Sequence, residues 1–241
     1  MTPESLGFKQ FFQEYEKITQ DMDSVFQKIQ ADFPKEVRCH KGCSECCYAL
    51  FDLTLVEALY INTKFHEMLS DQDQAAIRER ADVADREIHK IKRRIYKSRQ
   101  QGAATEDILQ DVGRNKVRCP LLTEGDRCAL YACRPVTCRV YGLPLSIGGV
   151  VHTCAQTGFQ PGEKYPTIFW DKLQDRLLEL SQRLATSIPT RYTQLGEVLV
   201  PLSMALLNEY DEEYLGLVQP KETAKPAGKS DTEWVLGPDG D

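Results

Sequence analysis

Nine cysteines restrict what this chain of 241 residues can fold into more than any other feature of its sequence. Two groups of four are followed by a single cysteine: Cys39, Cys43, Cys46 and Cys47; Cys119, Cys128, Cys133 and Cys138; and Cys154. Within each group the gaps are short enough for tight turns to direct successive thiolates at one ion or one cluster. We therefore predict that all nine cysteines are candidate metal ligands.

The N-terminal sequence bears on the compartment in which these cysteines work. Residues 1–16 contain acidic side chains where a secretory signal would have a basic segment followed by an apolar run. We therefore expect a cytoplasmic protein, and in a reducing compartment clustered cysteines bind metal more often than they form disulfides. The odd number of cysteines also argues against complete internal pairing.

The adjacent pair Cys46 and Cys47 indicates more than one small ion, because neighbouring side chains diverge. Two sites, or two irons of one cluster, suit this pair better. Nine thiols would give two four-thiolate sites with one thiol to spare, or a [4Fe–4S] cluster with a smaller site. His40 and His152 lie beside cysteines in the sequence and are the possible substitutes as ligands.

Five cysteines have an arginine as their direct neighbour in the sequence. Beside a four-thiolate site of net negative charge, a guanidinium group would favour thiolate and raise the potential of a reducible cluster. We assign this supporting role to Arg134 and Arg139, because the turn at Pro135 is expected to hold them close to the ligands. The alternative is that each arginine pairs with a surface carboxylate.

Hydrophobic periodicity predicts a mainly α fold: a helical domain with two irregular, cysteine-rich segments of loops and short strands organised around a metal centre. The segment 117–154 is divided by proline and glycine into pieces too short for helices and is expected to bury little apolar area, so that metal binding must hold it. A small hairpin is expected over 145–152. Helices are expected over 3–33, with Thr2 as the cap and Pro3 in the first turn; from Thr54 to about 69; and from Asp71 to about 97. Further helices are expected over 105–112, over 169–184 and from Pro201 past Tyr214.

The same reading divides the chain into four parts. Residues 1–35 form an N-terminal amphipathic helix, and residues 36–160 form the cysteine-cluster domain that binds metal. Residues 161–218 are predicted to contain C-terminal helices that pack on that domain. Residues 219–241, rich in charged residues, proline and glycine, are interpreted as a disordered tail.

Several of these motifs carry a family resemblance. The cysteine run at 39–47, then LTLVEALYI, CPLL, CALY, RPVTC and RVYG resemble the YkgJ-type cysteine-cluster family, described as zinc- or iron-chelating, over about residues 39–154. The resemblance implies a metal centre built from the cysteines, often supposed to be Fe–S, and no established reaction. The chain departs from the usual pattern by an additional thiol, Cys133, just before Arg134, which leaves open whether Cys133 is a ligand or a neighbour of ligands.

Composition excludes several other classes of function. With 30 Lys and Arg against 36 Asp and Glu, the net charge of −6 argues against broad nucleic-acid binding, and the basic stretch 86–99 is interpreted as a solvated helix face. The apolar runs are too short to cross a membrane. There is no Walker A loop, Rossmann glycine fingerprint or Gly-x-Ser-x-Gly elbow in the sequence.

We therefore predict a cytoplasmic metal-binding protein that holds an Fe–S cluster, or alternatively zinc or iron ions, with a redox, electron-transfer or metal-handling role and an unidentified protein partner. Fe–S is favoured over zinc by the vicinal cysteines, the number of thiols and the flanking arginines. One alternative is a protein-modifying enzyme, because the resemblance extends to flagellin lysine methylases with a similar cysteine run. Another is a structural zinc site in an interaction module. Cys154, alone in the sequence, is expected to matter least.

Overall fold

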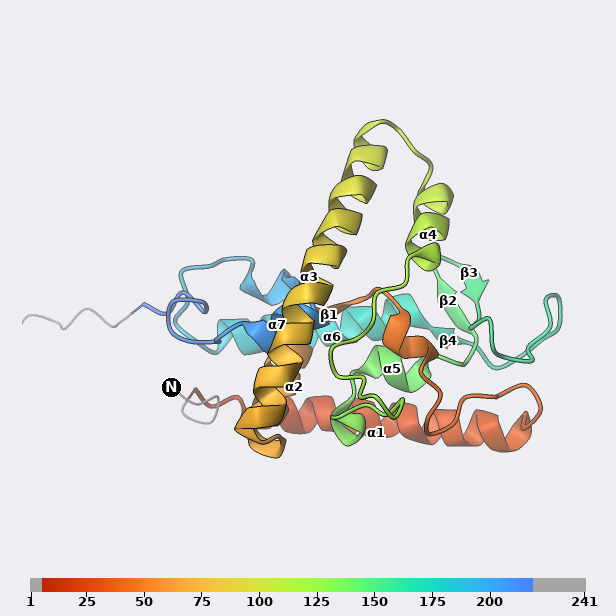
Figure 1. The fold of residues 1–241 in the computed structure, drawn as a ribbon, viewed down its shortest axis with the longest axis horizontal. Coiled ribbons are helices and arrows are strands. Elements are labelled where there is room, and N and C mark those ends of the chain that lie inside the picture. The colour runs from red at the N-terminus through yellow and green to blue at the C-terminus, as the bar shows by residue number, and fades with distance from the viewer. Residues whose placement is uncertain (1–5, 219–241) are drawn as a thin grey trace, which may run out of the picture.

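The computed structural model describes residues 6–218, so Thr2, Pro3 and the predicted tail at 219–241 lie outside the described residues. Helices dominate the described chain, which confirms the prediction of a mainly α fold (Figure 1). Their bounds are α1 (Lys9–Asp32), α2 (Leu55–Met68), α3 (Asp71–Gln100), α4 (Thr105–Arg114), α5 (Val136–Val140), α6 (Trp170–Thr186) and α7 (Leu202–Leu207). Among the described helices, none is both long enough and apolar enough to cross a membrane.

The strands are short and form two small sheets. β1 (Asp52–Thr54) pairs antiparallel with β5 (Leu199–Pro201), with Leu53 opposite Val200. The second sheet has the order β3-β2-β4 and contains β2 (Leu145–Ile147), β3 (Val150–His152) and β4 (Ile168–Phe169). β2 and β3 form the predicted hairpin, with Gly148 and Gly149 at positive φ in its turn, and β4 pairs parallel with β2.

The main core lies where α1, α2 and α6 meet. Phe11, Tyr15 and Ile18 form the buried stripe of α1, at the helical spacing found in the sequence. They pack in one cluster with buried side chains of α2 and α6, including Leu59 and Leu177. The first turn of α1 starts at Lys9, after a turn in which Gly7 has a φ of 74°, and so six residues later than the periodicity predicted.

The capping box predicted at the start of α2 is present. The Thr54 side chain accepts from the backbone of the third helical residue, Glu57, whose carboxylate in turn accepts from the backbone N–H of Thr54. Asp71 was the predicted cap of α3, but Ser70 holds that position, and its hydroxyl accepts from the backbone N–H of Asp73. Serine fits because its short side chain reaches the backbone two or three residues into the helix.

α3 and α4 form a hairpin that projects beyond the other helices (Figure 1). The lower part of α3 packs against α7, and its far half packs against α4 and reaches β1 through the Lys92–Asp52 ion pair. The predicted helix at 105–112 is confirmed and extends to Arg114. The apolar side chains of α3 beyond Ala84 are therefore less covered than those nearer its start.

The predicted helix over 201–214 is wrong beyond Leu207. The side-chain amide of Asn62 in α2 donates to the carbonyl oxygens of Ala205, at 3.0 Å, and Asn208, at 3.2 Å. These bonds satisfy carbonyl groups at the C-terminal end of α7, where a helix leaves them unpaired. The chain continues through turns to Val218 instead of as a helix.

The expectation that 117–154 contains no helix and buries little apolar area is also wrong. α5 lies inside this segment, with Val136 and Val140 both at 0% exposure. Leu121, Leu130 and Leu143 are equally inaccessible to solvent. The cysteine-bearing segment thus contributes to the core, and the apolar area that it buries stabilises its fold without metal.

Candidate metal centre

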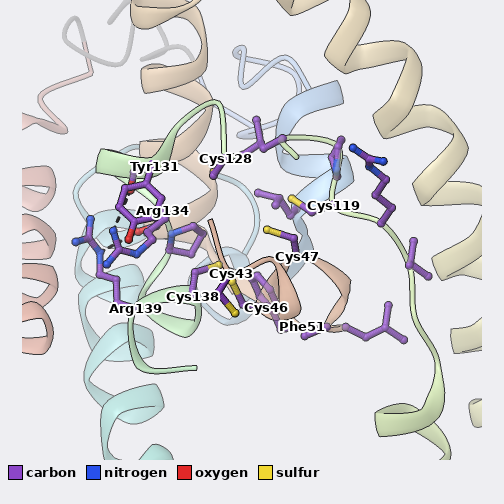
Figure 2. Close-up of a pocket in the computed structure, with 18 of the residues that line it drawn as sticks. Cys43, Cys46, Cys47, Phe51, Cys119, Cys128, Tyr131, Arg134, Cys138 and Arg139 are labelled. Carbon is purple, nitrogen blue, oxygen red and sulfur yellow. Dashed lines mark hydrogen bonds between the residues drawn. The ribbon is translucent and has the colours of Figure 1, made fainter. Parts of the chain in front are cut away.

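The two cysteine groups, more than seventy residues apart, meet at one place (Figure 2). The first group lies on a loop and on a 3-10 helix over Glu45–Tyr48, and the second runs from the end of α4 into α5. The backbone N–H of Cys119 donates to the carbonyl oxygen of Cys47 at 2.6 Å, which fastens the two segments together. The structure therefore brings the two cysteine groups side by side, while a shared metal centre stays a prediction.

Four thiols lie in series, each close enough to the next to shift its pKa, in the order Cys138, Cys46, Cys47 and Cys119. Cys46 lies between Cys138 and Cys47, whose thiol groups lower its pKa by stabilising the thiolate. The Cys47 thiol likewise lowers the pKa of Cys119. The vicinal cysteines thus point to different partners, Cys46 toward Cys138 and Cys47 toward Cys119, as Figure 2 shows.

A second set of thiols also includes Cys46. Cys39, Cys43, Cys46 and Cys154 line one small cavity beside Tyr141. Burial, followed by the nearby thiols of this set, raises the pKa of Cys39 to about 11. The β2–β3 hairpin thus brings back Cys154, which is isolated in the sequence, to the first cysteine group.

Gly142 allows the chain after α5 to approach Cys39 closely. A Cβ atom at this position would lie 2.9 Å from the Cβ of Cys39, closer than carbon atoms can pack. The glycine follows α5 directly, so the end of the second cysteine segment rests against the start of the first.

Cys128 and Cys133 occupy different surroundings. Cys128 lines the same cavity as Cys119 and Cys138, and burial raises its pKa to about 12. The Cys133 sulfur faces away from the other thiols and lies 3.5 Å from the Met68 sulfur, within reach of the Tyr60 hydroxyl. Eight cysteines therefore line the two cavities, and Cys133 packs against α2 instead.

The two arginines singled out from the sequence share one carboxylate, Asp23 of α1. Arg134 Nη2 donates to it at 3.2 Å, and Arg139, only 6% exposed, pairs with its other oxygen. Arg139 also donates to the carbonyl oxygens of Arg134, at 3.0 Å, and Ala132, at 2.7 Å. Both arginines therefore pair with a carboxylate, which was the alternative expectation, and their supporting role at a metal site stays a prediction. Arg134 also lies near enough to Cys46 and Cys128 for its charge to favour their thiolates.

Replacing Asp23 by asparagine tests how much the ion pairs of Asp23 with Arg134 and Arg139 contribute to stability. We expect Asp23→Asn to lower the free energy of unfolding by about 2 kcal/mol, because the buried Arg139 loses its charged partner. Asp21→Asn is the matched control on the same helix, since Asp21 faces Arg176 at 3.7 Å with both side chains more than half exposed, and it should change stability by less than about 0.5 kcal/mol. Urea unfolding followed by circular dichroism measures both variants. Equal effects would show that the Asp23 ion pairs stabilise the fold no more than the exposed Asp21 pair does.

Glu57 connects three elements next to the cysteines. Its carboxylate is buried and accepts from the backbone N–H and hydroxyl of Thr54, from the Tyr15 hydroxyl at 3.4 Å and from the backbone N–H of Val136 at 3.3 Å. Val136 is the first residue of α5, so Glu57 fixes the helix that carries Cys138. Burial raises the pKa of Glu57.

The sequence did not reveal the roles of Asp23 and Glu57 at the site. Asp23 lies among the polar positions of α1, and Glu57 was identified only as part of a capping box. Their partners in the second cysteine segment are about 80 residues or more away along the chain. His40 and His152 are both exposed, and His40 Nδ1 lies 2.9 Å from the carbonyl oxygen of Arg38.

The donor set suits zinc or iron, because clustered thiolates are the preferred protein ligands of zinc and of Fe–S clusters. Among the described residues, no three cysteine, histidine, aspartate or glutamate side chains converge in the arrangement of a metal site. The four thiols of the series instead lie beside one another, close enough to shift one another's pKa. Coordination by these side chains would form sulfur–metal bonds and release the thiol protons.

Comparison with known proteins agrees with this chemistry. Residues 38–155 match the model of the CxxCxxCC family, described as a putative zinc- or iron-chelating domain. The matched range includes all nine cysteines. Searches of curated proteins and of solved structures find no match to the chain. The family match confirms the resemblance seen in the motifs and supports binding of zinc or iron by this part of the chain.

Proposed function

We propose that this chain, whose residues 38–155 match the model of the CxxCxxCC family, holds an Fe–S cluster or iron or zinc ions through eight cysteines and serves in redox chemistry, electron transfer or metal handling. The observation that carries the proposal is that eight cysteines from both groups and Cys154 line two neighbouring cavities, with Cys46 lining both. Thiols that lie this close together are suited to sharing a metal ion or cluster.

The eight thiols line two neighbouring cavities. Cys39, Cys43 and Cys46 line both; of these two cavities, Cys154 lines only the smaller one, and Cys47, Cys119, Cys128 and Cys138 line only the larger one. Eight thiols are enough for two four-thiolate sites, which leaves one cysteine of the nine to spare. We assign Cys133 as the spare, because its sulfur contacts Met68 and Tyr60 instead of another cysteine.

Iron rather than zinc is supported by the vicinal pair, whose two sulfurs belong to different parts of the thiol series. Arg134 beside Cys46 and Cys128 adds positive charge near the thiolates, which would raise the potential of a reducible cluster. The half-buried position of most of the cysteines leaves an edge of the site close to solvent, as electron transfer to a partner requires.

Anaerobic purification followed by elemental analysis and visible absorption tests the proposal. We expect brown protein that contains iron and acid-labile sulfide and loses its colour in air. Colourless protein with stoichiometric zinc and no sulfide, after expression with ample iron, would overturn the Fe–S assignment and leave a zinc protein. Protein with neither metal, after expression with both supplied, would overturn metal binding itself.

A further inference from the structure

The cavity beside the cysteines extends well beyond them. It has a volume of about 890 Å³, within the range of about 300–1,000 Å³ typical of small-molecule sites. Cys46, Cys47, Cys119 and Cys138 line one end, with Phe51 at the same cavity (Figure 2). The other end reaches α3 and α4, which contain no cysteine. That end is therefore separate from the proposed metal ligands.

The end formed by α3 is apolar. Ile88, Ile91 and Ile95, at successive helical turns, line it together with Val112 of α4. All four side chains are only half-buried, because the projecting α3–α4 hairpin lacks a third helix to cover this face. An apolar ligand lying along the isoleucines would remove this surface from water.

The charged lining of the cavity is strongly one-sided. Two carboxylates, Asp52 and Asp126, stand against six cationic side chains in a protein of net charge −6: Lys41, Lys92, Arg118, Arg127, Arg134 and Arg139. Lys92 pairs with Asp52, and Arg134 and Arg139 pair with Asp23. Within residues 6–218, the other three cations have no carboxylate in ion-pair contact. Positive charge in such a cavity favours an anionic ligand.

We propose that this cavity binds an amphipathic anion, a small molecule whose apolar body lies along the α3 isoleucines and whose carboxylate or phosphate head lies near Lys41, Arg118 and Arg127. Arg118 is held in place by donating to the carbonyl oxygens of Leu122, at 3.2 Å, and Thr123, at 2.9 Å. A neutral apolar molecule would give the three cations no anionic partner, and a small hydrophilic anion would leave the isoleucines exposed. The proposal stands independently of the metal, because the isoleucine wall contains no thiol.

Isothermal titration calorimetry of the purified full chain with four probes tests the ligand class. Decanoate and decyl phosphate carry the predicted apolar body and head, decyltrimethylammonium has the same body with a positive head, and acetate has the head alone. We expect saturable one-to-one binding of decanoate or decyl phosphate, at least tenfold tighter than the other two probes, and the tighter of these two identifies the head group. Equal binding of decyltrimethylammonium, or uptake that does not saturate, would overturn the proposal.

Two variants, each with a control, test whether the ligand binds in this cavity. Ile91→Trp should fill the apolar end and weaken decanoate binding at least tenfold. Val83→Trp should not, because Val83 lies on the same helix outside the cavity lining and is 57% exposed. Arg127→Ala on the exposed loop should weaken binding, and Lys90→Ala, outside the cavity lining, should leave it unchanged. Equal affinity in Ile91→Trp and Val83→Trp, or in Arg127→Ala and Lys90→Ala, contradicts the site. Metal content measured on the same samples separates loss of this site from failure of the proposed metal binding.

Discussion

Replacing Cys46 by serine is expected to reduce bound metal more than about tenfold and to lower the melting temperature by about 10 °C. Cys46 lies between Cys138 and Cys47 in the thiol series and lines both cavities, so its loss removes a candidate ligand from each cavity. Binding energy at a site made by two distant segments is also folding energy, which the variant gives up. The fold should survive, because the second segment buries Leu130 and Val136 in the core without help from metal.

Cys133→Ser is the matched control for this experiment. Its sulfur is as buried as that of Cys47 but contacts Met68 and Tyr60, so we expect nearly full metal content and a small loss of stability. Elemental analysis and thermal unfolding of both variants, purified anaerobically, give the comparison. Equal loss of metal from the two would show that Cys133 is a ligand and that the division into eight and one is wrong.

Cys154→Ser distinguishes sequence-based from structure-based expectation at one residue. Its isolation in the sequence predicts that it matters least, while the cavity that it shares with Cys39 and Cys43 predicts a clear loss of metal. The two expectations differ because the two-glycine hairpin reverses the chain direction just before Cys154, which position along the chain does not indicate. Elemental analysis of Cys154→Ser beside Cys46→Ser decides between them.

Local patterns in the sequence predicted most of the helices. The Thr54 and Glu57 box, the apolar stripe of α1 and the glycine pair at 148–149 each act over a few residues, and each is found in the structure. The end of α7 was mispredicted because the group that satisfies its carbonyls is Asn62, which lies far away on α2. Local periodicity contains no information about such a partner.

The predictions for the candidate site also divide into those that depend on local sequence and those that depend on distant partners. Cysteine spacing predicted the candidate ligands, since metal-binding motifs are local, and the fold places the two groups side by side. Asp23 and Glu57 could not be found, because a carboxylate on a helix is ordinary until the fold brings a distant arginine or backbone N–H to it. The anion-binding cavity likewise depends on how α3 and α4 leave their facing side chains half covered.

Replacing Glu57 by alanine should lower the free energy of unfolding by about 3 kcal/mol or more. The substitution leaves the backbone N–H groups of Thr54 and Val136 without their acceptor at a buried position, and it opens a cavity between α1, α2 and α5. Loss of an acceptor for a buried donor costs the desolvation free energy of that donor. Because α5 carries Cys138, we also expect weaker metal binding, although Glu57 does not line the cysteine cavities.

Glu67→Ala provides the control for Glu57→Ala. Glu67 lies on the same helix, its side chain is 47% exposed, and it pairs with Lys64, so its loss should cost less than about 0.5 kcal/mol.

Glu57→Gln adds a test by pH. Burial raises the folded-state pKa of Glu57, so the folded protein retains this proton more strongly than the unfolded chain does. Stability from this group is then fully present below the ordinary glutamate pKa of about 4.3 and is lost as pH rises through the raised value. The stability of the natural protein relative to Glu57→Gln should therefore fall as pH rises above about 4.3. Urea unfolding across this range measures it, and a relative stability that rises with pH would show that the hydrogen bonds to the carboxylate outweigh its burial.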